Sequence, residues 1–142
     1  MALAAAQVVD AVQALLAPVG LTGGRVYTSR LWPLTESELP AGLVFATDEE
    51  IELQDIHGLL QLHTLSIAAR GYVRETQGLD DSLNSVAAAW LAALFAGSPP
   101  YSLRCTGIQR EMTNEFEAAT GRVTLQLQAQ YFTQPSAPET IL

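Results

Sequence analysis

Three side chains of types that commonly bind metal ions lie close together near the middle of the sequence. They are Asp55, His57 and His63, and an acidic run precedes them. Zinc binds histidine and carboxylate ligands in a tetrahedral arrangement, so a metal-dependent enzyme is one interpretation of this cluster. However, His57 and His63 are six residues apart, which is neither the spacing of a helical i,i+4 pair nor that of a tight turn. We therefore favour a surface hairpin tip with two ordinary histidines, and predict neither metal nor cofactor.

The acidic run before this cluster offers oxygen ligands of the kind that Ca²⁺ prefers. It lacks the regular Asp-x-Asp-x-Asp-Gly pattern of a calcium-binding loop. We expect instead a charged strand that faces solvent or a neighbouring subunit, with arginines of the next strand supplying the opposite charge in a homo-oligomer. The interface residues predicted on this basis are Asp48, Glu49, Glu50, Glu52, Arg70 and Arg74.

The other reactive side chains form no recognisable catalytic motif. Ser98 lies where a helix is expected to end and lacks the Gly-x-Ser-x-Gly pattern of a nucleophile elbow. Glu36 and Glu38 are paired acids in a proline-flanked loop without a further signature of acid–base catalysis. The glycine-rich segment 20–24 lacks the lysine and the helix of a phosphate-binding loop. The sequence therefore predicts that the chain is not an enzyme.

The amino-acid composition of the chain limits which classes of binding partner are expected. The 142 residues carry a formal net charge of −8, and all seven basic residues are arginines. A basic surface, which sequence-independent binding to a phosphate backbone requires, is therefore not expected, and no sequence-specific nucleic-acid site is predicted. No apolar run approaches the ~18 residues of a membrane span, so no membrane partner is predicted. The single cysteine, Cys105, excludes an internal disulfide and fits a reducing compartment.

Two segments show the periodicity of amphipathic helices. Residues 4–17 place valines and leucines on one stripe and end before Pro18. Residues 78–95 form the clearest helix, with Asp80 or Asp81 as the expected N-cap. Trp90 lies on the apolar stripe of this helix, and its many alanines keep it slim enough to pack closely on a sheet.

Five segments are predicted to be strands: 25–29, 42–53, 59–73, 103–115 and 122–133. The second and third should form a hairpin with its tip near 54–58, and residues 31–40 should form a loop. The last strand alternates, with residues 123, 125, 127, 129 and 131 facing a core. Its opposite face is polar but uncharged, which suits a neighbouring subunit or a channel wall as well as an ordinary sheet surface. Gln126 and Gln128 on that face complete the predicted interface.

The element order is therefore α-β-β-β-α-β-β. Consecutive strands are expected to form hairpins, and both helices to pack on one face of the sheet. The predicted fold class is α+β, with a mostly antiparallel sheet of about four to five strands. We expect one domain over residues 1–133 and an extended C-terminal tail over 134–142 that is ordered only by a partner.

The order of several short motifs resembles one protein family. Residues 25–34 read Arg-Val-Tyr-Thr-Ser-Arg-Leu-Trp-Pro-Leu, and residues 39–51 read Leu-Pro-Ala-Gly-Leu-Val-Phe-Ala-Thr-Asp-Glu-Glu-Ile. The strand end at 69–74, the helix start at 79–83 and the strand end at 130–133 match as well. Together they resemble the tail terminators of long-tailed phages, the minor tail protein U family, over most of residues 4–133. The order and spacing of the motifs carry the resemblance, since none is a catalytic signature.

The resemblance implies a structural virion protein. Such subunits form a hexameric ring that caps the tail tube, stops its polymerisation and presents a surface for head–tail joining. The implied partners are further copies of the chain, the major tail-tube protein and a head-side connector or neck protein, with DNA passing through the ring. The implied location is the tail–neck region of the virion, after assembly in the cytoplasm of a bacterial host. The alternative is another neck or tail-completion protein, such as a head-closure subunit, of a phage or phage-like particle.

Overall fold

The structure, a computed structural model, describes residues 3–19, 26–28, 41–55, 57, 59–74, 78–113 and 120–142. Along the chain the elements are α1 (Ala4–Leu16), β1 (Val26–Tyr27), β2 (Ala41–Leu53), β3 (Gln61–Arg74), α2 (Leu79–Leu94), β4 (Ser102–Thr113) and β5 (Thr120–Thr133). Both predicted helices and all five predicted strands are present, and the α+β class is confirmed. The expected loop over 31–40, including Glu36 and Glu38, lies outside the described residues.

The five strands form one sheet in the order β1-β2-β3-β5-β4. The expected antiparallel pairing of β2 with β3 is confirmed, and β5 pairs antiparallel with both β3 and β4. The expectation that all consecutive strands form hairpins is wrong for β1, which runs parallel to β2. Parallel neighbours need a crossover connection of about a dozen residues or more, and residues 28–40 supply that length between the two strands.

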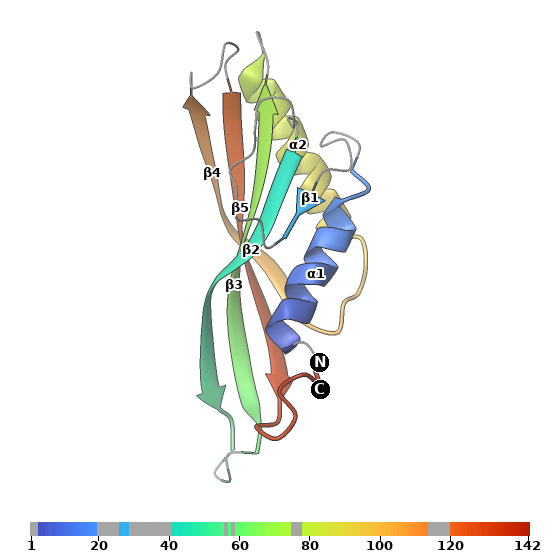
Figure 1. The fold of residues 1–142 in the computed structure, drawn as a ribbon, viewed down its shortest axis with the longest axis vertical. Helices are drawn as coiled ribbons and strands as arrows, with labels where there is room; N and C mark the ends of the chain where they lie inside the picture. Colours follow the sequence, from blue (N-terminus) through green and yellow to red (C-terminus); the bar gives the residue numbers. More distant parts are fainter. Residues whose placement is uncertain are drawn as a thin grey trace.

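Both helices cover the same face of the sheet, as predicted (Figure 1). Their apolar stripes and the inward-facing residues of β2, β3 and β5 form a single core, in which Trp90 is fully buried. We call this covered side the helix face and the opposite side the open face. No helix in the described part of the chain is long and apolar enough to cross a membrane.

Two glycines of the sheet allow α2 to approach closely. A Cβ atom built on Gly42 would lie 2.8 Å from the Trp90 ring, and one built on Gly71 would lie 2.9 Å from Val86. Both distances are shorter than van der Waals contact, so a larger residue at either position would push the helix away. The indole therefore rests directly on the backbone of β2 and β3.

The start of α2 differs from the prediction. The N-cap is Gly78, whose φ of +70° lies in the left-handed region that glycine adopts without strain. Asp80 and Asp81 lie inside the helix, beyond its N-cap, and no side chain caps it. The helix thus spans Leu79–Leu94, close to the predicted 78–95, but its N-cap lies two or three residues before the predicted Asp80 or Asp81 because the positive φ of Gly78 starts the helical turn there.

Each of the two long strands beside the central pair contains a β-bulge. One lies between Ala46 and Asp48 in β2, and the other lies between Cys105 and Gly107 in β4. Both occur on the same row of the sheet, since Ala46 and Cys105 are connected through paired residues of β3 and β5. A bulge increases local twist. Figure 1 accordingly shows the strands crossing steeply near the middle of the sheet.

The C-terminal tail is ordered by its own chain, contrary to the expectation that only a partner would order it. The Ala4 amide donates to the Pro138 carbonyl at 3.1 Å, and the Leu142 amide donates to the Phe132 carbonyl at 2.9 Å. The Gln7 side chain also donates to the carbonyl of Glu139. The tail is held because the free backbone donors at the start of α1 lie next to its carbonyl groups.

Replacing Trp90 by alanine should test the core. Because the indole is fully buried between α2 and the sheet, Trp90→Ala should lower the free energy of unfolding by about 3–5 kcal/mol. Urea denaturation followed by circular dichroism measures this change. Ala88→Ser, on the exposed side of the same helix, is the control and should change stability by less than about 0.5 kcal/mol. A similarly small change for Trp90→Ala would contradict the packing described here.

Candidate functional site

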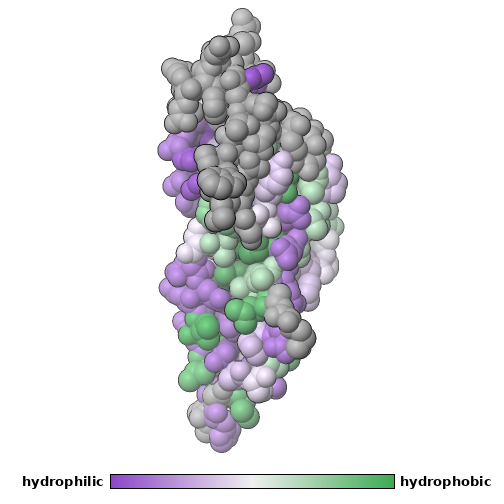
Figure 2. Space-filling view, viewed as in Figure 1, coloured by the Kyte–Doolittle hydropathy of each residue, from purple (hydrophilic) through white to green (hydrophobic). Residues whose placement is uncertain are grey.

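The β2–β3 hairpin extends past both helices at one end of the sheet (Figure 1). Every residue of β2 from Ala46 to Leu53 is exposed. Figure 2 shows apolar side chains among hydrophilic ones at this end of the molecule. The exposed apolar residues of the hairpin are Ile51, Leu53 and Leu59. We call residues 46–65 the hairpin arm.

The β2 bulge determines which way the acidic side chains point. Val44 lies on the helix face, so strict alternation would place residues 48, 50 and 52 there as well. The extra residue at the bulge shifts the register, and Glu49 instead pairs with Leu65, whose side chain is in the core. The acidic run is therefore divided: Asp48, Glu50 and Glu52 lie on the open face, and Glu49 lies on the helix face.

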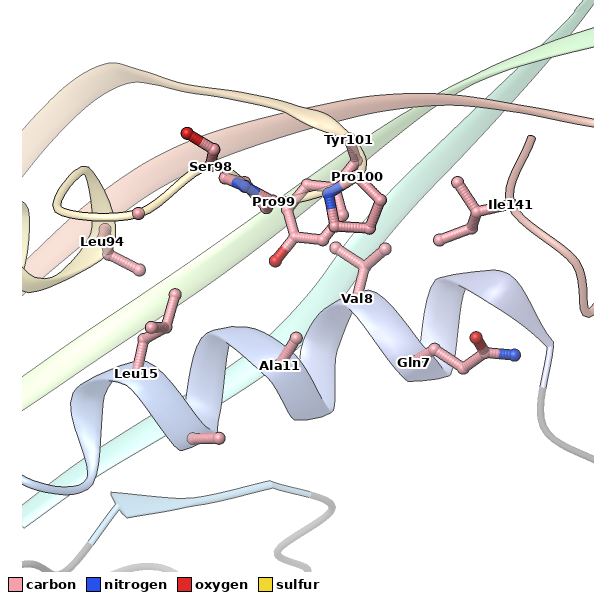
Figure 3. A pocket seen from close by; sticks show the side chains of 12 residues that line it. Gln7, Val8, Ala11, Leu15, Leu94, Ser98, Pro99, Pro100, Tyr101 and Ile141 are labelled. Carbon is pink, nitrogen blue, oxygen red and sulfur yellow. The ribbon is translucent and has the colours of Figure 1, made fainter.

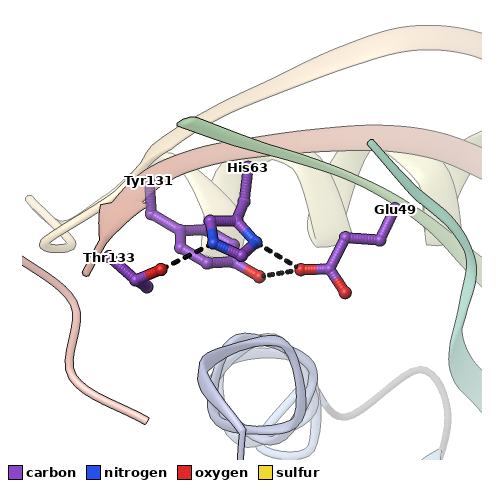
Figure 4. A network of polar contacts seen from close by, with 4 residues as sticks. All are labelled: Glu49, His63, Tyr131 and Thr133. Atoms are coloured by element: carbon purple, nitrogen blue, oxygen red, sulfur yellow. Dashed lines mark hydrogen bonds and ion pairs between the residues drawn. The ribbon is translucent and has the colours of Figure 1, made fainter. Parts of the chain in front are cut away.

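Glu49 belongs to a cluster of polar side chains that joins three strands (Figure 4). Its Oε1 atom lies 2.7 Å from His63 Nδ1 and accepts a hydrogen bond of 2.8 Å from the Tyr131 hydroxyl. His63 Nε2 lies 2.6 Å from the Thr133 hydroxyl oxygen. Because a carboxylate only accepts, Nδ1 donates to Glu49, and Nε2 and the Thr133 hydroxyl share the second hydrogen bond of the ring. The rings of His63 and Tyr131 are stacked, with centroids 4.9 Å apart.

His63 is therefore not the ordinary surface histidine that the sequence suggested. Its exposed fraction is 6%, because it has the same parity on β3 as Leu65, Ile67 and Ala69 and faces the core. That parity was visible in the sequence, whereas the carboxylate that meets the ring depends on the bulge in β2. The cluster fixes the base of the hairpin arm to β5 and satisfies each polar group that it buries.

Burial raises the pKa of the Tyr131 phenol far above its ordinary value, and the hydrogen bond to Glu49 and the negative charge of that residue raise it further. The phenol thus stays protonated as a donor to the carboxylate throughout the neutral and mildly alkaline range. Burial likewise raises the pKa of Tyr101, the residue directly before β4.

The side chains suggested as metal ligands do not come together. Asp55 Oδ1 accepts hydrogen bonds from the amides of Leu59 and Leu60, at 2.8 Å and 3.3 Å, and so closes the turn of the hairpin. His57 is exposed, and His63 is held in the buried cluster. Within the described ranges, no three His, Cys, Asp or Glu side chains are grouped so that they could hold a metal ion.

Gln126 and Gln128 lie on the open face, as the alternation of β5 predicts. They border a hollow of about 260 Å³ whose lining is mostly polar. Arg70 also lines this hollow, with its guanidinium carbon 5.0 Å from the centre of the Phe45 ring, a cation–π contact. Its Nε atom is buried and has no hydrogen-bond partner among the described residues. The hollow therefore presents a cation surrounded by amide and hydroxyl groups.

The predicted interface residues form separate groups on the single chain. Glu50 is level with Thr64 on β3, and Arg70 lies six residues farther along that strand. At ~3.3 Å per residue the separation is roughly 20 Å, so these groups do not neutralise each other within one copy. Arg74, at the end of β3, is farther still.

An apolar pocket that sequence reasoning missed lies between α1, the segment 97–101 and the tail (Figure 3). Its volume is about 560 Å³, and Val8, Leu15 and Ile141 are among the side chains that line it. The pair Pro99 and Pro100 forms the opposite wall. Leu15 belongs to the apolar stripe predicted for the first helix and yet remains exposed in this pocket. An apolar stripe wider than the core can cover was therefore the signal in the sequence for this pocket.

Comparison with known proteins does not identify the chain. No protein-family model matches it, and no curated protein is significantly similar to it.

Removing the Tyr131 hydroxyl should test the buried cluster. Tyr131→Phe deletes one donor to Glu49 and should cost about 1–2 kcal/mol of stability near pH 7, measured by urea denaturation. Because folding raises the pKa of Tyr131, the stabilisation by the neutral phenol is fully present below the ordinary pKa of about 10 and is lost as the pH rises above it. Between pH 9 and pH 11, wild-type stability should therefore fall more steeply than that of Tyr131→Phe. Equal slopes would contradict the assignment.

Proposed function

We propose that the chain is a structural ring subunit of the tail-terminator type, which caps the tail tube of a long-tailed phage or phage-like particle. The observation that carries this proposal is the resemblance of residues 4–133 to tail terminators in the order and spacing of motifs. The resemblance implies an α/β subunit without a catalytic residue. The α-β-β-β-α-β-β order and the mostly antiparallel sheet are compatible with it.

The surfaces of the chain support a role in assembly. A ring subunit must present different surfaces to its neighbours, to the tube below it and to the connector above it. The hairpin arm, the polar hollow around Arg70 and the apolar pocket beside α1 are three such surfaces, and they differ in chemistry. The hydrogen bonds between Glu49, His63 and Tyr131 hold the base of the arm in one position, so less conformational entropy is lost when the arm binds a partner.

The partners in this proposal are further copies of the chain in a hexameric ring, the major tail-tube protein and a head-side connector. In this proposal the ring stops tube polymerisation, provides the head–tail joining surface in the tail–neck region of the virion, and leaves a channel for DNA. Assembly takes place in the cytoplasm of the bacterial host.

Electron microscopy of negatively stained protein tests the proposal. Purified chain, alone or mixed with the major tail-tube protein of the same particle, should form rings that bind the end of tubes and limit their length. Chemical cross-links should connect it to the tube protein. Cross-links to the head-side adaptor without any to the tube would favour the alternative, a head-closure subunit. A chain that stays monomeric both alone and with tube protein would refute the ring.

Charge reversal at the arginines of β3 should impair assembly. Arg70→Glu places a carboxylate in the hollow on the open face, and Arg74→Glu changes the exposed end of the same strand. Either substitution should raise the concentration needed for ring formation about tenfold or more, because an attractive contact becomes repulsive. Light scattering measures assembly. Arg70→Lys keeps the charge and serves as the control, and unchanged far-UV circular dichroism shows that the fold persists. Loss of folding would instead assign these arginines to the stability of the monomer.

A further inference from the structure

The sheet has two strand edges that pair with nothing else in the described part of the chain. On one side, β1 pairs with β2 only at Gly42 and Leu43, so the backbone of β2 from Val44 to Leu53 is an open edge there. On the other side, β4 is the last strand in the sheet order. Open edges are templates for pairing with another strand, and proteins usually protect them or use them.

The two edges carry opposite charges. Asp48, Glu50 and Glu52 on β2 are exposed and have no ion-pair partner among the described residues. On β4, Arg104 is exposed, lies on the open face as these carboxylates do, and donates among the described residues only to the neutral amide oxygen of Gln128. Arg110 donates to the amide oxygen of Asn84 on α2, and it lies on the helix face in the row of Gly42, away from the acidic side chains.

The remaining carboxylates of these two strands are bonded within the chain. Glu111 on β4 forms an ion pair with Arg122 of β5. On β2, Glu49 points to the helix face and accepts hydrogen bonds from His63 and Tyr131. We call β2 residues 48–53 the acidic edge and β4 residues 102–105, which contain Arg104, the arginine edge.

The strand directions allow the two edges to join. β2 runs antiparallel to β3, β3 to β5 and β5 to β4, so β2 and β4 run in opposite directions. Copies that stand in the same orientation would therefore place β4 of one beside β2 of the next as an antiparallel pair, with the helices on the same side. Asp48 and Arg104 lie on one row of the sheet, through Ser66 and Gln128, so an unstaggered pair brings these two charges to the same level.

The helix face of the arm is apolar where the open face is acidic. Ile51 and Leu53 lie on the helix face, and their exposed fractions are 54% and 64%. The arginine edge begins directly after Tyr101, which lines the apolar pocket together with Pro99 and Pro100. An arm that joins this edge would therefore turn its apolar side chains towards an apolar surface.

We propose that the acidic edge of one copy pairs with the arginine edge of a second copy as an added antiparallel strand, with Ile51 and Leu53 covering the pocket beside Tyr101. This inference rests on the proposed ring, for which it names the contact. The contact joins two different surfaces, so it can repeat from copy to copy. It closes into a ring when a whole number of rotations between neighbouring copies makes a full turn. Pairing of two like edges is opposed because it would bring like charges together.

A charge-swap experiment on the full chain tests the pairing. The acidic-edge variant is Asp48→Arg/Glu50→Arg, and the arginine-edge variant is Arg104→Glu. Each alone should need at least about tenfold more protein to assemble than wild type, as measured by size-exclusion chromatography with light scattering. An equal mixture should assemble again, because every contact in an alternating ring then joins opposite charges.

The control variant Asp81→Arg reverses an exposed charge on α2, one turn before the Asn84 side chain that contacts Arg110 and away from the row of Asp48 and Arg104, and it should assemble like wild type. Far-UV circular dichroism and thermal melting show whether each variant keeps its fold.

Each outcome decides for or against the pairing. Restored assembly in the mixture supports it. Variants that assemble like wild type, or a mixture that stays dissociated while the single variants are impaired, overturn the pairing but leave the ring intact. Wild-type chain that remains monomeric alone and with tube protein overturns both the pairing and the proposed function.

Discussion

The placement of every candidate residue depends on the register of β3 between β2 and β5. These three long strands are paired along almost their whole length, and one face of each is buried under the helices. A shift of one residue would move the whole apolar set of β3 to the open face, at a cost that no surface interaction could offset. The core therefore determines which side chains of β2 and β5 reach the open face, and the surface chemistry follows from the core.

Much of this arrangement could be predicted from the sequence, because alternation in a half-buried strand is a local signal. The alternation of β5 placed Gln126 and Gln128 correctly, and the stripe on α2 placed Trp90 in the core. The division of the acidic run could not be predicted, because the bulge after Ala46 has no marker in the local residues. The partner of His63 depends on that bulge. The parallel direction of β1 and the ordered conformation of the C-terminal tail depend on contacts between distant segments. The hydrophobic periodicity of the sequence does not reveal such contacts.

The two bulges affect both the twist of the sheet and the direction in which charged side chains of β2 point. They lie on one row of the sheet, where they increase its twist, and the polar hollow around Arg70 lies on the open face beside them. On β2 the bulge also turns three carboxylates outward and one inward, where the inward one meets His63 and Tyr131. A single inserted residue thus produces both the acidic edge and the cluster that supports it. The edge and its support are for this reason not independent features of the chain.

The C-terminal tail lies beside the start of α1, where the Ala4 amide donates to the Pro138 carbonyl (Figure 1). A mechanical load applied between the two ends of the described chain would act first on this contact. The few bonds near the termini would open before the load passed from the tail to the end of β5 at Thr133. The terminal contacts are therefore the first to yield to tension, whereas a load entering through the strand edges would be distributed over the many hydrogen bonds of the ladders.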